Sequence, residues 1–326
     1  MQANEKGPVR KDQAMTPRLP LIHHPGYTFD WPERHPFPMA KFQALRAYLS
    51  KAGFDDDARI EWRRPAPANG TQLLRAHTEA YLQTFYLGDS DPGVQKRSGF
   101  PWSPALVERT LLEVGGTLET VRAALATGLA CNTAGGTHHA YPNAASGYCL
   151  LNDLAIAALE AIAVHDIKRI LVIDCDVHQG DGTAFIFQND PRVFTFSIHG
   201  ADNFPFVKRR SDRDIALPRG TDDRRYQAVL AKEIPELLER LAPELVLFDA
   251  GADVHTNDRL GHFDLSLAGI YRRDLYVLRQ CRRRGVPVAA VIGGGYDRNL
   301  EALAERHARL LLAAQQVARE GATAGP

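Results

Sequence analysis

The residues best suited to chemistry in this chain lie in the segment Ile170–Gly182. The segment begins as an apolar run typical of a buried strand, and then places three carboxylates, one imidazole and two glycines within nine residues. Burying an unpaired charge costs several kcal/mol or shifts its pKa, so such a cluster at a strand end indicates a bound metal ion. Asp176 and His178 are two residues apart and would face the same side of an extended segment, where they can share one ion.

A third metal ligand is available at another predicted strand end, where Asp253 follows the apolar run 245–249. One histidine and two aspartates leave a coordination position open for water and substrate, which is typical of a catalytic metal site. This donor set favours Zn²⁺ and is also compatible with Fe²⁺, Mn²⁺ and Co²⁺. The alternative is that these carboxylates cap helices or close turns, as Asp181 before Gly182 would.

The adjacent histidines His138 and His139 are candidate catalytic residues in a glycine-rich loop. Adjacent side chains in an extended segment point in opposite directions, and tandem histidines also occur on protein surfaces, so the pair alone does not establish catalysis. Asp174 and Asp181 favour a catalytic role. Each carboxylate can accept a hydrogen bond from the outer ring N–H of one histidine, which fixes the tautomer and raises the basicity of that ring.

A run of three glycines, Gly293–Gly295, follows the last apolar run and precedes Tyr296. Glycine lets a backbone approach a ligand closely, which makes Gly294 a candidate substrate contact. The run lacks the spacing of a phosphate-binding loop. Tyr296 is a candidate donor to a developing oxyanion; a buried structural tyrosine is the alternative.

Apolar runs alternate with helical patterns, which predicts an α/β fold: a three-layer αβα sandwich with a mostly parallel sheet. Chemically reactive residues follow four such runs in succession, and ligands bind outside the carboxyl ends of parallel strands, so we expect these residues to meet at one edge. The expected strands are Arg169–Asp174, Val193–Ile198, Glu244–Asp249 and Val286–Ile292. The expected helices are Met39–Ala52, Gln72–Phe85, Pro104–Ala126, Leu150–Val164, Arg225–Arg240, Leu267–Arg284 and Leu300–Ala318.

Length and composition indicate one domain with a sizeable core. The chain has 326 residues, of which 44% are hydrophobic and 24% charged. We find no linker and no internal repeat. We therefore expect a single catalytic domain over residues 19–318, with flexible segments at 1–18 and 319–326.

Charge and cysteine usage exclude several classes of protein. Lys+Arg and Asp+Glu balance at 39 each, so no overall field favours nucleic acid or a membrane surface as a partner. The basic clusters Lys208–Arg210 and Arg282–Arg284 are interpreted as solvated surface. There is no signal peptide, no apolar run of membrane-spanning length and no cysteine spacing typical of secreted domains. These features predict a cytoplasmic protein.

Four blocks of sequence resemble the zinc-dependent histone deacetylase superfamily, which has the arginase/deacetylase fold. Their order and spacing match the family: GGTHHAYPNAASGYCLLNDLAIA (135–157), ILVIDCDVHQGDGTAFIF (170–187), LVLFDAGADVHTNDRLG (245–261) and IGGGYDRNL (292–300). Two N-terminal blocks, HPGYTFDWPERHPFPMAKF (24–42) and RSGFPWSPALVERT (97–110), are similar to bacterial relatives of the class IV deacetylases. The single Gln179, where many members carry a second histidine, is similar to them as well.

The resemblance implies a role for each matching position. Asp176, His178 and Asp253 match the zinc ligands, and His138 and His139 match the histidines beside the zinc-bound water, partnered by Asp174 and Asp181. Tyr296 matches the oxyanion-stabilising tyrosine. Gly147 and Tyr148 match the Gly-Phe pair of the acyl-lysine tunnel, with a tyrosine in place of the usual phenylalanine. Asp174, Ser197 and the main-chain carbonyls of Asp176, His178 and Ile198 match a structural K⁺ site.

The function implied by the resemblance is hydrolysis of an N-acyl-lysine, in a peptide or in a small molecule, by a metal-activated water. Acylpolyamines and long-chain fatty-acyl-lysines are alternative substrates. Two rival functions differ in class: a binuclear arginase-like manganese hydrolase, and a catalytically silent protein that binds acyl-lysine. The first needs further Asp or His ligands for a second ion, and the second usually lacks a ligand or the tyrosine. The sequence predicts no particular oligomeric state.

Overall fold

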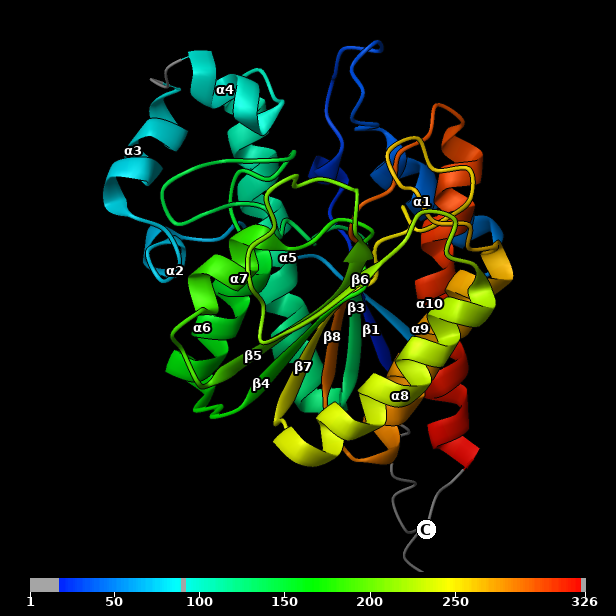
Figure 1. The fold of residues 1–326 in the computed structure, drawn as a ribbon. Coiled ribbons are helices and arrows are strands. Elements are labelled where there is room, and N and C mark those ends of the chain that lie inside the picture. Colours follow the sequence, from blue (N-terminus) through cyan, green and yellow to red (C-terminus); the bar gives the residue numbers. More distant parts are fainter. Residues whose placement is uncertain (1–17, 89–91, 324–326) are drawn as a thin grey trace, which may run out of the picture.

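A parallel sheet of eight strands forms the centre of the molecule in this computed structural model, which describes residues 18–88 and 92–323 (Figure 1). The order of strands in the sheet is β2-β1-β3-β8-β7-β4-β5-β6, and every neighbouring pair is parallel. The strands are β1 Leu19–Ile22, β2 Ile60–Arg63, β3 Leu129–Asn132, β4 Ile170–Asp174, β5 Val193–Gly200, β6 Arg213–Leu217, β7 Leu245–Asp249 and β8 Val288–Val291.

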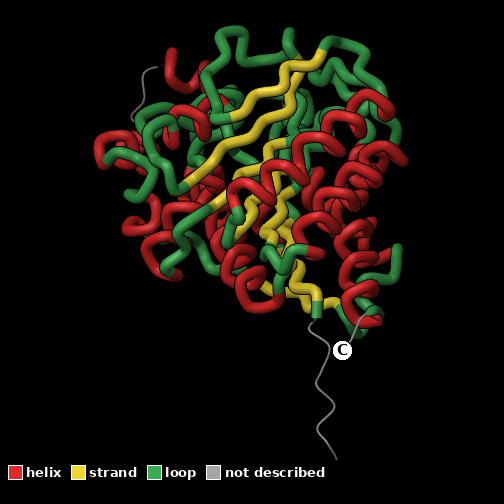
Figure 2. Tube along the Cα trace, turned by 60° about the horizontal axis from the view of Figure 1, so that its bottom comes forward, coloured by secondary structure: helices red, strands yellow, loops and turns green. Residues whose placement is uncertain are grey.

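Helices cover both faces of this sheet, so the predicted three-layer αβα sandwich is confirmed (Figures 1 and 2). Helices α5, α6 and α7 lie on one face, whereas α1, α8, α9 and α10 lie on the other. The helices are α1 Lys41–Lys51, α2 Gly70–Leu73, α3 Glu79–Leu87, α4 Pro92–Ser98, α5 Pro104–Thr127, α6 Asp153–His165, α7 Asp181–Phe187, α8 Asp223–Leu241, α9 Leu267–Arg283 and α10 Leu300–Thr323, with a 3₁₀ turn η1 at Pro25–Tyr27.

The packing of strand β4 explains why its sequence is apolar at successive positions instead of alternating between apolar and polar residues. Leu171 and Ile173 pack into the core on the side of α8–α10, and Ile170 and Val172 pack into the core on the side of α5 and α6. Since both faces are covered, each residue of the strand must be apolar. The same alternation places Asp174 on the face of Ile170 and Val172, at the carboxyl end of the strand.

Most predicted elements are present with shifted ends. The four predicted strands correspond to β4, β5, β7 and β8, each within two residues at either end. Strands β1, β2, β3 and β6 and helices α4 and α7 were not predicted, because segments of four to seven residues are too short to show a clear period. The predicted helix 150–164 begins only at Asp153, since the side chain of Asn152 accepts a hydrogen bond from Ala155 N and caps it.

The prediction of one helix over Gln72–Phe85 is wrong. The chain forms two helices instead, α2 and α3. Thr78 lies between them in extended conformation, and its hydroxyl accepts from Tyr81 N at the start of α3. Next to it, Nε2 of His77 accepts from Asn152 N at 2.9 Å. These two polar contacts outweigh continuation of the helix between α2 and α3.

At the C-terminal end, helix α10 continues to Thr323 and so extends five residues past the predicted helix end at Ala318. Residues 1–17 and 324–326 lie outside the described part of the chain, and a flexible character there stays a prediction. The division into a catalytic domain at 19–318 with flexible ends is likewise still a prediction. Within residues 18–88 and 92–323, none of the helices has the length and apolar character to cross a membrane.

Buried His77 makes folding sensitive to acid. Burial lowers its pKa from 6.5 to about 4. In the unfolded chain His77 would bind a proton below about pH 6.5, so the unfolded state holds more protons and stability falls as the pH drops from there toward 4. We expect a loss of about 2 kcal/mol between pH 7 and pH 5 from this group. Urea unfolding at both pH values measures it; in His77→Gln, whose amide oxygen can still accept from Asn152 N, the loss should be smaller by this amount.

Candidate functional site

The carboxyl ends of β3, β4, β7 and β8 bring the predicted site residues together at one edge of the sheet. A pocket opens above this edge, and His139, Gly147, Tyr148, His178 and Tyr296 all line it. These five residues come from three separate loops, so only the parallel sheet places them in a single cavity.

Asp176, His178 and Asp253 form a buried group with metal-ligand character. One ligand atom from each lies within 4.8 Å of the others. Nδ1 of His178 is 2.9 Å from Oδ1 of Asp176 and 3.1 Å from Oδ2 of Asp253. The other oxygens of the two carboxylates accept backbone N–H groups, from Gly294 at 2.7 Å and from Val177 at 2.9 Å. Backbone amides thus orient one oxygen of each carboxylate toward the same point as Nδ1.

The buried negative charges of this group favour the binding of a cation. Burial and the neighbouring Asp176 raise the pKa of Asp253 to about 7. Burial alone would lower the pKa of His178, but its hydrogen bonds to both carboxylates outweigh this and raise it to about 10. A proton on His178 therefore compensates part of the negative charge, and a divalent ion bound to the same three atoms would do so more fully. The donor set, the burial and the orientation of the ligand atoms fit a metal ion such as zinc.

Gly294, which was predicted to contact the substrate, lies beside the carboxylates of the metal-binding group. It is not among the described residues that line the pocket. A Cβ at this position would lie 2.2 Å from Oδ2 of Asp253 and 2.5 Å from Oδ2 of Asp176. The glycine is needed because the backbone passes directly beside the ligand carboxylates.

The paired histidines converge on one point. Nδ1 of His138 lies 2.8 Å from Oδ2 of Asp174, and Nδ1 of His139 lies 2.6 Å from Oδ1 of Asp181. The two inner Nε2 atoms are 3.2 Å apart. The geometry thus brings together the four residues that the sequence pairs, and the two Nε2 atoms face each other beside the pocket that His139 lines.

The two histidines differ in their protonation. Burial lowers the pKa of His139 to about 4, and the charge of His138 adds to this effect. Burial also disfavours a charged His138, but Asp174 and Asp176 outweigh it and raise its pKa well above the usual value. Two rings whose pKa values move apart are suited to separate acid and base roles.

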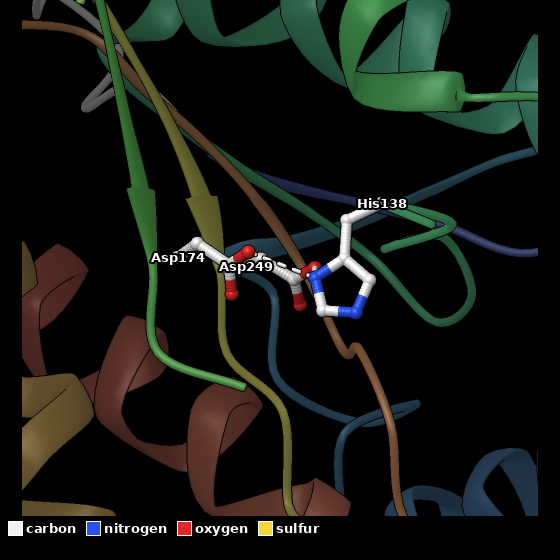
Figure 3. A group of neighbouring side chains, drawn as sticks. All are labelled: His138, Asp174 and Asp249. Atoms are coloured by element: carbon white, nitrogen blue, oxygen red, sulfur yellow. Dashed lines mark hydrogen bonds and ion pairs between the residues drawn. The ribbon is translucent and has the colours of Figure 1, made fainter. Parts of the chain in front are cut away.

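Asp249 lies beside His138 and Asp174, and the sequence analysis assigned it no role. Figure 3 shows its side chain next to Asp174 and His138, with Oδ2 at 3.7 Å from Nδ1 of His138. It is fully buried, and neither oxygen has a hydrogen-bond partner among the described residues. Burial and the charge of Asp174 raise its pKa well above the usual range, which favours the neutral acid. The signal in the sequence is that both β4 and β7 end in an aspartate, and these two aspartates are in register.

Tyr296 lines the pocket beside the metal-binding group. Its ring centroid is 6.2 Å from that of His178, and its backbone N–H donates to Oδ2 of Asp258 at 2.7 Å. The ammonium of Lys41, buried behind the ring at 5.7 Å from its centroid, donates to the carbonyl of Gly293 at 3.3 Å. Lys41 was not predicted, because a lysine near the start of a helix is usually solvated.

The walls of the pocket are aromatic. Gly147 has a φ of 51°, and a Cβ there would lie 2.6 Å from the His139 ring and 2.9 Å from Phe204. Tyr148 follows, with its ring packed against those of Phe100 and Tyr296 at 5.4 and 5.9 Å. Phe204 stacks edge-on against His139 at 4.9 Å. Phe204 is a wall residue that sequence reasoning missed; the aromatic run after β5 was its signal.

The residues predicted to bind potassium lie at the carboxyl end of β4 and on the neighbouring strand β5. Asp174 pairs with Ser197 in the register of β4 and β5, which puts their side chains on one face, and Ile198 is the next residue of β5. Oδ1 of Asp174 accepts from Asp176 N at 3.1 Å, and Ser197 Oγ is 3.0 Å from Nδ1 of His199. The carboxylate and hydroxyl are therefore neighbours, and their role in binding an ion stays a prediction.

Arg273 holds together the two loops that carry the metal-binding group. Its guanidinium is fully buried and donates to the carbonyls of Cys175, Ala250 and Gly251, at 3.1, 3.0 and 2.7 Å. It also pairs with Asp274 at 2.8 Å. A single side chain thus connects the loop after β4 with the loop after β7.

Replacement of Arg273 by methionine is expected to destabilise the fold by about 3–5 kcal/mol, because it leaves a buried carboxylate and buried carbonyls without partners. The pKa of Asp274, already raised to about 6 by burial, should rise further. Urea unfolding of wild type and variant measures the loss. The double variant Arg273→Met/Asp274→Asn should recover part of it; no recovery would contradict the charge-based explanation.

Comparison with known proteins matches this chain to one family. The histone deacetylase domain family matches residues 35–312. An uncharacterized protein of Picosynechococcus is 48% identical over 299 residues, which cover 92% of this chain and 99% of that protein. Histone deacetylase 2 of Arabidopsis thaliana is 29% identical over 80% of this chain and 70% of its own length. Histone deacetylase RPD3 of Saccharomyces cerevisiae is 33% identical over 73% of this chain and 59% of its own length.

Proposed function

Because this chain belongs to the histone deacetylase family and is thus a deacetylase-type hydrolase of amide bonds, we propose that it removes the acyl group from N-acyl-lysine in peptides with the help of zinc. The observation that carries this proposal is the convergence of both Nε2 atoms, 3.2 Å apart, beside the metal-binding group and Tyr296 in one pocket. His139, His178 and Tyr296 line the cavity, and His138, Asp176 and Asp253 contact these residues from behind it.

Asp176, His178 and Asp253 are the proposed zinc ligands. When bound, zinc would polarise the amide carbonyl and lower the pKa of a bound water. The backbone amides of Gly294 and Val177 keep the ligand carboxylates oriented, and Arg273 fixes the loops that carry them. Potassium at Asp174 and Ser197, together with the Ile198 carbonyl, is the proposed structural cation.

His139 is the proposed general base. Its lowered pKa keeps the ring neutral near pH 7, so Nε2 can accept a proton from the attacking water. Asp181 accepts from Nδ1 of His139 and stabilises the charge that develops on the ring. The same Nε2 can then donate the proton to the leaving amine as the C–N bond breaks. The products are a carboxylate and a free lysine amine.

His138 and Tyr296 are the proposed stabilisers of the tetrahedral intermediate. Since Asp174 and Asp176 keep His138 charged, its Nε2–H is a donor with a full positive charge. Burial and the nearby carboxylates raise the pKa of Tyr296 well above 10, so its hydroxyl keeps its proton and can donate to the oxyanion. The acyl-lysine side chain would pass between the rings of Tyr148 and Phe204, which shield its methylenes from water.

A fluorogenic acetyl-lysine peptide tests the proposal. Zinc-loaded protein is expected to deacetylate the peptide, a chelator to stop the reaction, and added zinc to restore it. Metal analysis after dialysis should give about one zinc per chain, held by Asp176, His178 and Asp253. A second buried group, His138, Asp174 and Asp249, also has ligand atoms within 4.8 Å of one another and would hold the second ion of a binuclear site. Two tightly bound ions would favour an arginase-like site instead, and binding of the peptide without turnover would favour a silent acyl-lysine reader.

A further inference from the structure

The mouth of the pocket carries a lysine and an arginine from helix α4. Lys96 and Arg97 are both exposed and line the opening. Their position is fixed by the backbone, because Gly147 N donates to the Arg97 carbonyl at 3.2 Å and Tyr148 N donates to the Ser98 carbonyl at 2.9 Å. Neither side chain forms an ion pair with another described residue. Two cations without a partner among the described residues therefore stand beside the proposed acyl-lysine tunnel.

A third cation comes from the loop after β7. The backbone N–H of Arg259 donates to the carbonyl of Tyr296 at 3.1 Å, which ties this exposed arginine to the catalytic loop. Its charge acts on Tyr148 in the pocket wall: burial raises the pKa of that phenol, and Arg259 opposes the rise. The positive field thus extends around the mouth from a second segment of the chain.

The carboxylates near the mouth are already engaged. Asp202 lines the opening, but Arg219 binds it at 3.1 Å and Nδ1 of His262 lies 3.5 Å from its other oxygen. Asp258 is directed inward, where it accepts the backbone N–H groups of Leu260, Gly261 and Tyr296. Among the described residues around the opening, positive charge therefore exceeds negative charge.

This charge distribution bears on the part of the substrate that stays outside the tunnel. Charges in water act over about 8 Å at physiological ionic strength, so groups flanking the acylated lysine lie within reach. An acylpolyamine carries an ammonium only a few methylenes from its amide, and that ammonium would meet Lys96 and Arg97. A peptide with aspartate or glutamate beside the acylated lysine would meet the same cations as an attractive field.

We propose, building on the proposed function, that Lys96, Arg97 and Arg259 make the enzyme selective for acyl-lysine peptides with acidic flanking residues. Selection arises mainly in the encounter step, because exposed charges change the association rate and its salt dependence more than the chemical step. The chemical groups at the pocket floor are the same for all peptides.

The test is a set of three acetyl-lysine peptides whose flanking residues are all glutamate, all glutamine or all lysine. For the zinc-loaded enzyme at low salt, we expect kcat/KM for the glutamate peptide to exceed that for the lysine peptide by about tenfold or more, and the ratio to shrink toward one at 0.5 M salt (about twice the screening of physiological buffer). In Lys96→Glu/Arg97→Glu/Arg259→Glu the order of the two charged peptides should reverse, while the glutamine peptide stays within about twofold of wild type.

The matched control reverses three exposed arginines at the opposite edge of the sheet, in Arg122→Glu/Arg283→Glu/Arg284→Glu. This variant has the same net charge and should keep the wild-type order of peptides. Reversal in both variants, or equal rates for all peptides in wild type, would overturn the inference and leave the proposed deacylase activity intact. If none of the peptides is hydrolysed, the proposed function fails, and fluorescence anisotropy with the same labelled peptides still ranks their affinities; an order independent of charge would then refute the selectivity as well.

Discussion

Replacement of His178 by alanine is expected to abolish metal binding and, with it, activity. The imidazole supplies one of three ligand atoms, and the other two belong to carboxylates on either side of it, at 2.9 and 3.1 Å. Without the ring, Asp176 and Asp253 would face each other in a buried site with no cation between them. Loss of one partner from a buried charge cluster costs about 3–5 kcal/mol, so the variant should also unfold at lower urea concentration.

Zinc content after loading and exhaustive dialysis is the measurement. Wild type should retain about one equivalent, as expected for three protein ligands, whereas His178→Ala should retain far less. His165→Ala is the matched control, since His165 is exposed at the end of α6 and its removal should leave zinc content and activity unchanged. A folded His178→Ala protein with stoichiometric zinc would refute the ligand assignment. Circular dichroism establishes that the variant is folded.

The sequence predicts the metal-binding group because its signal is local. Asp176 and His178 lie two residues apart shortly after an apolar run, and this spacing predicts that they face one side. In the structure the strand ends at Asp174, and a bend over 176–178 brings the two side chains together. The parallel sheet follows from the same runs, because strands covered on both faces cannot alternate. Features encoded by short-range spacing and by the alternation of strands and helices are therefore predictable from the amino-acid sequence alone.

The parts that sequence reasoning missed depend on contacts between distant segments. Asp249 lies beside His138 only because β7 pairs with β4 in the register that aligns it with Asp174. Lys41 reaches the carbonyl of Gly293 across more than two hundred residues of chain, and its burial is a tertiary effect. Phe204 meets His139 through a loop that has no periodic pattern. The sequence marks Asp249 and Phe204 as unusual residues, but it does not show which residues they contact, and only the folded chain identifies those neighbours.

The break in the predicted helix 72–85 also results from contacts that the local sequence pattern does not show. The apolar pattern continues through Ala76, and local propensity alone favours one helix. The bond from Asn152 N to Nε2 of His77 and the cap of α3 by Thr78 are tertiary and capping contacts that override it. The break matters for the site, because Asn152 in turn donates to the carbonyls of His138 and Ala140 and so supports the loop of the paired histidines.

Replacement of Tyr296 by phenylalanine is expected to lower kcat by about 100- to 1,000-fold, which corresponds to the loss of one oxyanion donor. The variant keeps the ring, which packs near Phe37 and Tyr148 at centroid distances of 6.4 and 5.9 Å, so fold and pocket shape should not change. Tyr296 supplies no atom to the metal-binding group, and zinc content should stay at the wild-type value. The change in KM should be small, because the contact strengthens only as charge develops on the oxygen.

Tyr148→Phe provides the matched control, since it removes a hydroxyl from the same pocket at a wall position that our mechanism assigns no proton transfer or oxyanion contact. We expect its kcat to stay within a few-fold of wild type, with any effect seen in KM for different acyl chains. Steady-state kinetics on one acetyl-lysine peptide, with zinc measured in the same samples, separates the cases. A Tyr296→Phe enzyme that loses no more activity than Tyr148→Phe would show that the hydroxyl does not stabilise the oxyanion. The charged Nε2–H of His138 would then have to carry that role with the metal, and His138→Ala would become the variant with the larger loss.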